Sequence, residues 1–331
     1  MAKIDPGQEA TERRIKELEK RIRKEYAEAS KSVQTKLQDH LNAFAQKDKD
    51  QRALLDAEKI TEKEYQQWRL NQMAVGQRWE ELKTTLAQDY RNADRIARRI
   101  VNGERADVFA INGNFAAYEI EKSGKIDMSF SLYDADSVTR LVRDNPDVLP
   151  PLDRFGEQSR IKREIAEGKA VAWEKGQIQS AITQGILQGK AIPELAEYIA
   201  DNVGARNYST AVRYARTAMT EACNAGRYAS YRRAKDLGVD LTIEWNATLD
   251  HRTRHSHRQM HGQRREVDEP FEVDGHEILY PGYPYAVGNE IWNCRCSLSA
   301  MVKGYEIDTV TESPKMGDMT FDEWREAKEN G

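Results

Sequence analysis

Proline and glycine are nearly absent from the first part of this 331-residue chain. No proline occurs between Pro6 and Pro146, and no glycine occurs between Gly7 and Gly76. In a helix interior glycine costs about 1 kcal/mol and proline about 3 kcal/mol relative to alanine. The absence of both therefore argues against frequent turns in this part of the chain and predicts long, uninterrupted helices.

Cysteine and long apolar runs are also scarce. The chain has three cysteines, two of them in Cys294-Arg-Cys296, which excludes a disulfide framework and favours a reducing compartment. No uncharged stretch is long and apolar enough to cross a bilayer. The first residues contain no apolar segment, so we expect no secretory signal and no need for a membrane.

Charged residues are abundant instead. They make up 32% of the chain, with a net charge of −4, while hydrophobic residues make up 39%. This composition is typical of a chain that has a compact core together with elongated, solvated parts. At this length we expect two or three domains.

The first long helix is predicted by one apolar stripe with a mean spacing close to 3.6 residues. The charged run at residues 46–50 that follows is expected to be a loop. The stripe comprises Ile15, Leu18, Ile22, Tyr26, Ala29, Val33, Leu37, Leu41 and Phe44.

A second long helix is predicted from Thr61 to Ile100, and we expect it to pair antiparallel with the first. Thr61 and Glu64 have the spacing of a capping box. The apolar positions of this helix are Tyr65, Trp68, Val75, Trp79, Leu82, Leu86, Tyr90, Ala93, Ile96 and Ile100.

The middle of the chain has weaker signals. Residues 102–144 predict a shorter helix, then a strand-like piece over Met128–Tyr133, then a short helix begun by Asp134 or Asp136. The prolines at 146, 150 and 151 predict a domain junction.

After the junction, helices are predicted at 159–172 and 173–187, from Ile192, and at 207–237, where Gly238 ends the last of them. Strand-like runs follow at 241–245, 277–280 and 291–299. The fold class is therefore mainly α with a small C-terminal α+β unit, an elongated N-terminal helical hairpin and a helical middle domain. The expected domains are a long-helix arm at 1–145, a central helical domain at 152–238, the α+β unit at 239–305 and an acidic tail at 306–331.

Charge is segregated in the last third of the chain. Residues 206–265 hold twelve Lys and Arg against five Asp and Glu, whereas residues 266–331 hold five against fifteen. A basic face of this kind suits non-specific contact with double-stranded DNA or with an acidic protein surface. The alternative is that these are solvated faces that neutralise each other. The candidate contact residues are Arg213, Arg232, Arg233, Arg252, Arg254 and Arg258.

Histidine and cysteine predict a candidate zinc site. Five of the six histidines lie between His251 and His276, and Cys294 and Cys296 follow. Imidazole nitrogens and thiolates are the ligands of tetrahedral zinc. The candidate ligands are His257, His261, Cys294 and Cys296. The alternative is that the histidines are surface residues and the cysteines are small core residues.

An enzyme would need more than these residues. A metal-dependent nuclease requires an open metal position and a general base, yet Asp250 is the only acidic residue between Asn246 and Arg265. The chain has no glycine-rich phosphate loop, nucleophile elbow or His-Glu-x-x-His motif. We therefore expect no enzymatic activity, with a DNA-processing, zinc-dependent nuclease-like protein as the alternative.

Between residues 215 and 296, a succession of short motifs resembles the Mu protein F-like head morphogenesis family of tailed-phage minor head proteins. The run Tyr65-x-x-Trp68 with Trp79-Glu-Glu-Leu82 extends the resemblance upstream. Many relatives have a Pro-x-His-Pro-like approach to the cysteines, whereas this chain has Glu290-Ile-Trp-Asn293, which removes one possible ligand. The motifs are Ala215-Arg-Thr217, Glu221, Asn224-Ala-Gly-Arg227, Trp245-Asn-Ala-Thr-Leu-Asp250, Arg252-Thr-Arg254, His257, Gly262, Tyr280-Pro-Gly282 and Asn293-Cys-Arg-Cys296.

The resemblance implies a structural protein of the phage head, located inside the head near the portal and in the host cytoplasm during assembly. Implied partners are the portal protein and the scaffolding or major capsid protein, with roles in head assembly and in DNA packaging or ejection. Some relatives carry a fused toxin or ADP-ribosyltransferase domain, but only 35 residues follow Cys296, so we expect none here.

Two expectations combine the resemblance with the residues. His257 occupies a position where the family pattern also has histidine, so any metal is expected to be one structural zinc on Cys294, Cys296 and His257. Its fourth ligand would be His255, His261 or Asp250. Because alanines surround Arg216, Thr217 and Glu221, we expect a buried polar network there.

Overall fold

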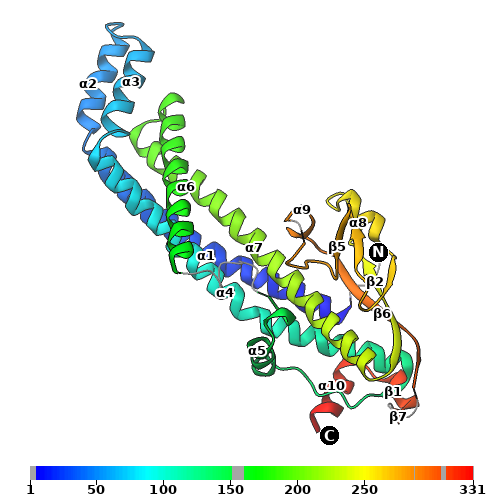
Figure 1. Ribbon diagram of the computed structural model, residues 1–331. Coiled ribbons are helices and arrows are strands. Elements are labelled where there is room, and N and C mark those ends of the chain that lie inside the picture. The colour runs from blue at the N-terminus through cyan, green and yellow to red at the C-terminus, as the bar shows by residue number, and fades with distance from the viewer. Residues whose placement is uncertain (1–4, 151–159, 287, 307–310, 331) are drawn as a thin grey trace. The chain divides into compact units, whose positions relative to one another are not determined.

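The computed structural model describes residues 5–150, 160–286, 288–306 and 311–330, without the side chains of residues 160–164 and 288. As predicted, the protein is mainly α with a small α+β part near its C-terminus (Figure 1). Its helices are α1 (Pro6–Asn42), α2 (Ala45–Asp56), α3 (Glu62–Met73), α4 (Gln77–Gly124), α5 (Ala135–Asp144), α6 (Arg160–Leu187), α7 (Ile192–Asp236), α8 (His255–Met260), α9 (Gly288–Ile291) and α10 (Phe321–Asn330), with 3-10 turns η1 (Pro146–Val148) and η2 (Pro314–Asp318). The strands are β1 (Ile126–Asp127), β2 (Val239–Asn246), β3 (Arg264–Glu266), β4 (Phe271–Val273), β5 (His276–Ile278), β6 (Ser297–Tyr305) and β7 (Thr311–Glu312).

The chain forms two compact units, each assembled from separate stretches of sequence. Unit 1 contains Met1–Leu18, Ile100–Asp153 and Arg213–Gly331, and unit 2 contains Glu19–Arg99 and Arg154–Val212. Helices α1, α4 and α7 contribute residues to both units. The domains expected from the sequence were consecutive stretches, and the expected start of the second, residue 152, lies outside the described residues.

In unit 2, α1 and α4 pack antiparallel, as predicted. Lys36 Nζ lies 2.6 Å from Asp89 Oδ2, and one turn further along α1 the His40 ring lies 5.5 Å from the ring of Trp79, earlier in α4. The predicted α1 stripe is buried along its length from Ile15 to Leu41. A period of 3.6 residues places all these side chains on one face of the helix, which explains why the apolar pattern alone predicted their burial.

Two local predictions in unit 2 are wrong. Residues 46–50 are not a loop but part of α2, where polar pairs four residues apart, such as Gln46 and Asp50, bond along one helix face. The predicted helix from Thr61 to Ile100 is two helices, because α3 ends at Met73 and Gly76 has a φ of +101°.

The predicted cap at the start of this segment is present, but two of its predicted buried residues are exposed. Thr61 and Glu64 form the predicted capping box at the start of α3. Val75 and Ile96, assigned to the buried stripe, are exposed. Val75 lies in the break between α3 and α4, and in α4 the buried face continues from Ala93 to Ala97, so Ile96 lies beside it.

Helices α6 and α7 are each continuous over residues predicted to form two helices. A helix was predicted to begin at residue 207. Instead, Asn207 lies inside α7 and its Nδ2 donates to Glu174 Oε2 of α6 at 2.9 Å, with both side chains buried. This tertiary hydrogen bond connects α6 and α7 in the middle of both helices.

Unit 1 contains the sheets. The central strand β2 pairs antiparallel with β3 on one side and β6 on the other, and its side chains alternate between buried and more exposed, as the period of a strand requires. The predicted strand at 241–245 is therefore confirmed within β2. The runs at 277–280 and 291–299 overlap β5 and β6, although α9 occupies the start of the latter.

The expected shorter helix at residue 102 and the strand at 128–133 are both wrong. Helix α4 continues to Gly124. Residues 128–133 are not a strand, because a side chain binds the backbone at their end: Asn114 accepts from Tyr133 N at 2.8 Å and donates to Tyr133 O at 2.9 Å. The helix begun by Asp134 is confirmed, since Asp134 caps α5.

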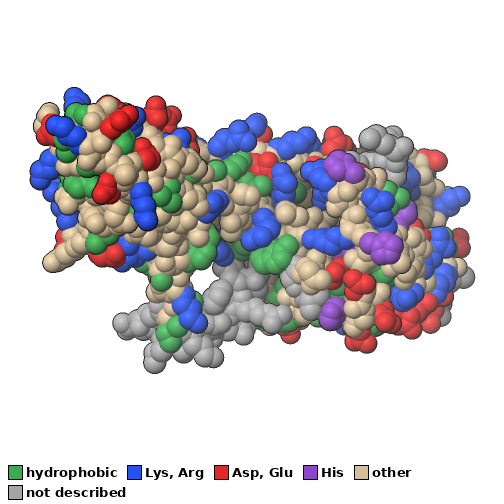
Figure 2. All heavy atoms as spheres, turned by 90° about the horizontal axis from the view of Figure 1, so that it is seen from above, with side chains coloured by type: hydrophobic (Ala, Val, Ile, Leu, Met, Phe, Trp, Pro, Cys, Tyr) green, Lys and Arg blue, Asp and Glu red, His purple; other side chains and the backbone are tan. Residues whose placement is uncertain are grey.

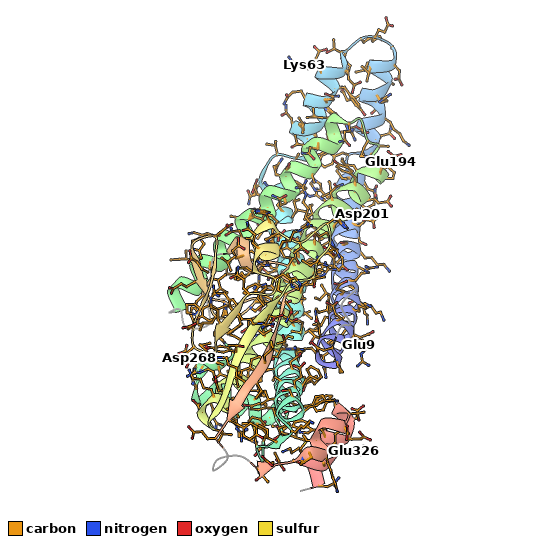
Figure 3. The ribbon with its side chains drawn as sticks, turned by 90° about the vertical axis from the view of Figure 1, so that its right-hand side faces the viewer. Glu9, Lys63, Glu194, Asp201, Asp268 and Glu326 are labelled. Carbon is orange, nitrogen blue, oxygen red and sulfur yellow. The ribbon has the colours of Figure 1, made fainter. Side chains whose placement is uncertain are left out.

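The acidic C-terminal segment is folded. Trp324 of α10 is fully buried, and its Nε1 donates to the buried carboxylate of Glu121 at 2.5 Å. Glu326 lies on the exposed side of the same helix (Figure 3). Trp324 therefore anchors the helix together with Phe321, whose ring lies 5.4 Å from that of Phe115, while most of the other residues of α10 are charged.

Candidate metal centre

His257 and the two cysteines come from neighbouring elements of unit 1. His257 lies on the short helix α8, and Cys294 and Cys296 lie in the segment that leads into β6. Side chains two residues apart in an extended chain point to the same side, so both cysteines are buried while Arg295 between them is less so. Asn293, with a φ of +54°, forms the turn before them.

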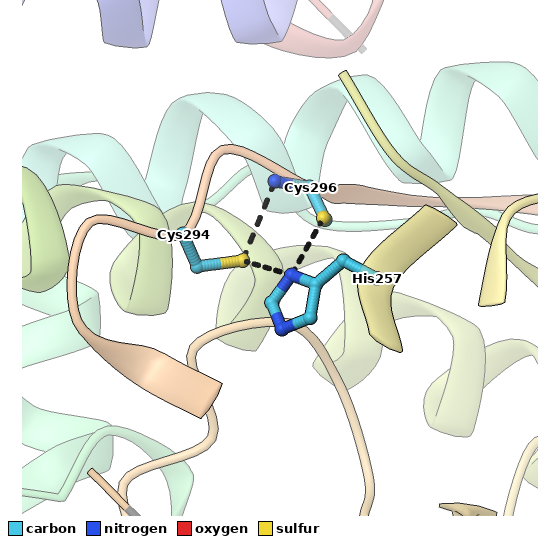
Figure 4. A group of neighbouring side chains, drawn as sticks. All are labelled: His257, Cys294 and Cys296. Carbon is cyan, nitrogen blue, oxygen red and sulfur yellow. Dashed lines mark hydrogen bonds between the residues drawn. The ribbon is translucent and has the colours of Figure 1, made fainter. Parts of the chain in front are cut away.

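The three side chains meet in one buried cluster (Figure 4). Nδ1 of His257 lies 3.3 Å from Cys296 Sγ and 3.7 Å from Cys294 Sγ, and all three atoms lie within 4.8 Å of one another. The exposed fractions of His257, Cys294 and Cys296 are 2%, 2% and 4%. Among the described residues this is a group whose donor atoms can hold a metal ion.

Glu290 contacts the opposite edge of the imidazole. Its Oε2 lies 3.0 Å from Nε2 of His257, and the carboxylate is itself buried. Ser256 Oγ donates to Oε2 and Asn289 Nδ2 donates to Oε1, both at 3.0 Å. The carboxylate is therefore held in place by two further side chains.

Glu290 is the residue of this cluster that sequence reasoning missed. In the sequence, the segment Glu290-Ile-Trp-Asn293 was interpreted only as the place where one possible metal ligand is missing. One signal was available: Glu290 is the only charged residue between Tyr280 and Cys294. A single carboxylate in an uncharged, aromatic-rich stretch indicates a specific partner.

The electrostatics of the cluster favour a thiolate at Cys294. The hydrogen bond with Cys296, and next the neighbouring His257, hold the pKa of the Cys294 thiol well below its usual range. Hydrogen bonding with Cys294, together with burial, raises the pKa of Cys296 well above its usual value. Burial lowers the pKa of His257, but contact with Cys294 outweighs it, so the net shift is upward.

The remaining proposed ligands do not join the cluster. His261 is exposed, and its Nδ1 accepts a hydrogen bond from Ala247 N at 3.2 Å. His255 is exposed at the start of α8. Asp250 makes two hydrogen bonds to the Arg295 guanidinium, at 2.6 and 2.7 Å. The four-ligand set expected from the sequence is corrected to three, because turns place the other side chains outside.

Helix α7 binds the backbone of the cysteine segment through a row of buried polar side chains. Thr217 Oγ1 accepts from Asn293 N at 3.1 Å, and Thr220 Oγ1 donates to Cys294 O at 2.7 Å. Asn224 Nδ2 donates to Cys296 O at 3.0 Å. The helix therefore fixes the position of both cysteines.

The predicted buried polar network on α7 is confirmed for Thr217 and Glu221, whereas Arg216 is half-buried, and the network extends further than expected. Glu221 is fully buried and pairs with Arg105 of α4 at 2.6 Å. Arg227 is also buried, and it donates to Leu298 O at 2.9 Å and to Asp5 Oδ1 at 2.5 Å. Both pairs connect α7 to other parts of unit 1, which gives the motif residues a structural role.

The six candidate arginines do not form a single free basic surface. Arg213 stacks over the Trp292 ring at 5.3 Å, and Arg254 donates to the Trp292 carbonyl. Arg258 donates to Asp250 O at 2.6 Å, and the exposed Arg252 lies 3.9 Å from the Asp250 carboxylate.

The other two arginines lie near the end of α7. Arg232 lies 3.5 Å from Asp268, and Arg233 stacks over the Phe130 ring at 4.9 Å. Figure 2 shows Lys and Arg side chains around exposed histidines on one face of the molecule. Part of the basic character is therefore on the surface, although each of the six side chains also has an internal contact.

Comparison with known proteins finds similarity to phage proteins over the part of the chain that contains this cluster. The family described as Phage Mu protein F like protein matches residues 176–299, a range that includes all of α7 and α8 and the cysteine pair. The minor head protein GP7 of Bacillus phage SPP1 is 29% identical over 233 residues, which cover 69% of this chain and 68% of GP7.

A second relative has an enzyme name. The NAD(+)--arginine ADP-ribosyltransferase EFV of Enterococcus faecalis is 30% identical over 213 residues, which cover 62% of this chain. This chain spans only 40% of the length of that relative. No solved structure matches the chain significantly.

Proposed function

We propose that the whole chain is a structural minor head protein of a tailed phage, because residues 176–299 match the family described as Phage Mu protein F like protein and a longer stretch is similar to a phage minor head protein. In this proposal it resides in the virion, inside the head near the portal, and passes through the host cytoplasm during assembly. It acts in head morphogenesis and in DNA packaging or ejection. The portal protein is its main partner.

The similarity to GP7 is the observation that carries the proposal. It extends over 233 residues, against 124 in the family match, and covers more than two thirds of both chains. The likeness therefore includes regions outside the metal cluster, which supports a common role for the whole protein.

The structure supports an architectural role over a nuclease. The side chains that suggested metal chemistry are almost fully buried, so a DNA strand cannot reach them, as it would have to in a metal-dependent nuclease. The buried polar residues of α7 bind backbone groups and ion-pair partners within unit 1.

Exposed apolar side chains support contact between unit 2 and another virion protein. Large hydrophobic residues at the surface cost free energy unless a partner covers them. Trp173 also lines an open hollow with Arg206. The exposed residues in unit 2 are Val75, Ile96, Ile165, Trp173 and Leu187.

Portal binding is tested by co-expression of the full chain with the portal protein and purification of portal rings. A variant with Ile96→Ser and Trp173→Ser is expected to lose co-purification. The matched control carries Leu249→Ser and Met301→Ser, which alter exposed apolar residues of unit 1, and it is expected to bind. Deletion of residues 1–100 is not a suitable test of portal binding, because it would remove parts of α1 and α4 that belong to unit 1 as well as to unit 2. Absence of wild-type chain from the rings, or its capture by scaffolding or major capsid protein instead, would contradict the proposal.

Double-stranded DNA is proposed as a non-specific partner of the exposed arginines. Residues 206–265 carry an excess of seven positive charges, from twelve basic and five acidic residues. Arg213→Ala with Arg252→Ala is expected to reduce the slope of log affinity against log salt by up to about 1.8, or about 0.9 per phosphate contact. The charge-matched control is Lys47→Ala with Lys63→Ala. A gel shift without binding at low salt rejects this partner.

We propose that the chain is not an enzyme. Incubation with labelled NAD+ and an arginine-containing acceptor tests the activity that its Enterococcus faecalis relative is named for. We expect no label on the acceptor above a control without protein, and transfer of label would overturn the proposal.

Among the described residues, no helix has the length and apolar character needed to cross a membrane.

A further inference from the structure

We propose that His257, Cys294 and Cys296 bind one structural Zn²⁺ ion through Nδ1 and two thiolates, with Glu290 as the positioning residue for the imidazole. This inference goes beyond the role in the phage head. It depends only on the geometry within unit 1.

The distances between donor atoms fit zinc. Bond lengths of about 2.1 Å to nitrogen and 2.3 Å to sulfur at a tetrahedral angle require a nitrogen-to-sulfur distance of about 3.6 Å. The two distances from His257 Nδ1 are 3.3 Å to Cys296 and 3.7 Å to Cys294. Both nitrogen-to-sulfur distances are therefore within a few tenths of an ångström of the distance that a tetrahedral zinc requires.

Glu290 selects the tautomer that zinc needs. A carboxylate only accepts hydrogen bonds, so its contact at 3.0 Å places the imidazole proton on Nε2. The lone pair is then on Nδ1, which faces the two sulfur atoms (Figure 4). Carboxylates that orient a metal-binding histidine in this way raise its basicity and its affinity for the ion.

The surroundings of the cluster supply hydrogen-bond donors. Cys296 N donates to Cys294 Sγ at 3.4 Å. The indole nitrogen of Trp245, whose ring centroid lies 5.6 Å from that of His257, is buried without a hydrogen-bond partner. A bound divalent cation would offset the charges of the two sulfur atoms.

The fourth position of the tetrahedron is assigned to a solvent oxygen. His261 and His255 are exposed, and Asp250 is already bound by Arg295. The role of the ion is structural even with three protein ligands, because α7 holds both cysteine carbonyls and little of the cluster is accessible. The ion links α8 to the segment before β6, through ligands 37 positions apart in the sequence, and stabilises the small α+β part.

Elemental analysis of the full chain, purified without chelator, tests the zinc itself. We expect one zinc per chain, and less than a tenth of an equivalent in Cys294→Ser and Cys296→Ser. Cys223→Ser is the matched control, because Cys223 is buried but bonds to Asn112 instead, and it should keep the metal. His261→Asn should also keep the metal, and its loss there would overturn the assigned ligand set.

Cobalt provides a measurement that does not depend on folding of the variants. Metal-free wild-type chain titrated with Co²⁺ is expected to develop thiolate-to-cobalt absorption and the intense visible bands of a tetrahedral site. The proposal is overturned if wild-type chain contains less than a tenth of an equivalent of zinc, shows no thiolate-to-cobalt absorption and melts at the same temperature with and without chelator.

Glu290→Gln tests the positioning role separately. The amide keeps the shape but removes the charge, so we expect zinc affinity to fall by about 10- to 100-fold in competition with a chelator. The melting temperature in saturating zinc should remain that of wild type. The control Glu272→Gln, at an exposed position of β4, should leave affinity unchanged. Equal affinity in wild type and Glu290→Gln would exclude the positioning role.

Discussion

Nδ2 of Asn224 donates a hydrogen bond to the carbonyl oxygen of Cys296 at 3.0 Å. The same side chain accepts from Leu298 N at 2.9 Å and donates to Pro281 O at 3.0 Å. One buried amide on α7 therefore binds three backbone groups from two segments that are distant in sequence. It joins the turn at Pro281 to the first residues of β6.

Asn224→Ala is expected to destabilise the protein by about 3–5 kcal/mol, because each buried backbone group left without a partner costs about 1–3 kcal/mol. Urea unfolding measures the change. Asn92→Ala, at an exposed position of α4, is the control and should change stability by less than about 0.5 kcal/mol. A loss below about 1 kcal/mol in Asn224→Ala would show that water replaces the amide.

Two glycines in helices predict opposite responses to the same substitution. A Cβ at Gly226 of α7 would lie 2.2 Å from the backbone oxygen of Phe109 in α4, so the helices would have to separate. Nothing lies within 4 Å of a Cβ at Gly103.

Gly226→Ala should therefore lose about 1–3 kcal/mol or more of unfolding free energy, while Gly103→Ala should gain about 0.5–1 kcal/mol from helix propensity. Both substitutions are in unit 1, so thermal unfolding of the two variants compares them directly. Equal effects of the two substitutions would contradict the close approach of α4 and α7.

The features that the sequence predicted correctly depend on local patterns. The burial of Ile15 to Leu41 follows from a 3.6-residue period, and the caps at Thr61 and Asp134 depend on residues three apart. Cys294 and Cys296 were recognised as a pair from their residue type and spacing, whereas His257 was chosen among the histidines because its position resembles that of a histidine in the family pattern.

The features that it missed depend on contacts between distant residues. Asn207 remains inside α7 because Glu174 of α6 binds it, and Asn114 of α4 prevents strand pairing near Tyr133. Glu290 contacts His257 across 33 positions. The exclusion of His261 has the same origin, since its side chain is exposed and turned toward Ala247. Spacing alone does not contain this information.

Trp324 is expected to be the anchor of the C-terminal segment. Trp324→Ala removes a fully buried ring and the hydrogen-bond donor to Glu121, and we expect a loss of about 3–5 kcal/mol. Trp324→Phe keeps an aromatic ring but not the donor, so it should lose less. Urea unfolding and limited proteolysis of residues 321–330 distinguish the two. Resistance of Trp324→Ala to both would mean that α10 contributes little to the fold.

Glu174 should make stability depend on pH between about 4.5 and 7. Burial raises the pKa of its carboxyl from 4.5 to about 7 in the folded state. Between these values the folded chain binds more protons than the unfolded chain, so this group's contribution to stability is present below pH 4.5 and is lost as pH rises to 7.

Glu174→Gln keeps an acceptor for Asn207 without the charge. Its stability relative to wild type should therefore increase over this range, reaching on the order of 2 kcal/mol above pH 7 after allowance for partial exposure. Urea unfolding at pH 5, 6, 7 and 8 measures the difference, with the exposed Glu197→Gln of α7 as the control for loss of a surface charge. A constant difference between Glu174→Gln and wild type across these pH values would show that the carboxyl is hydrated in the folded protein.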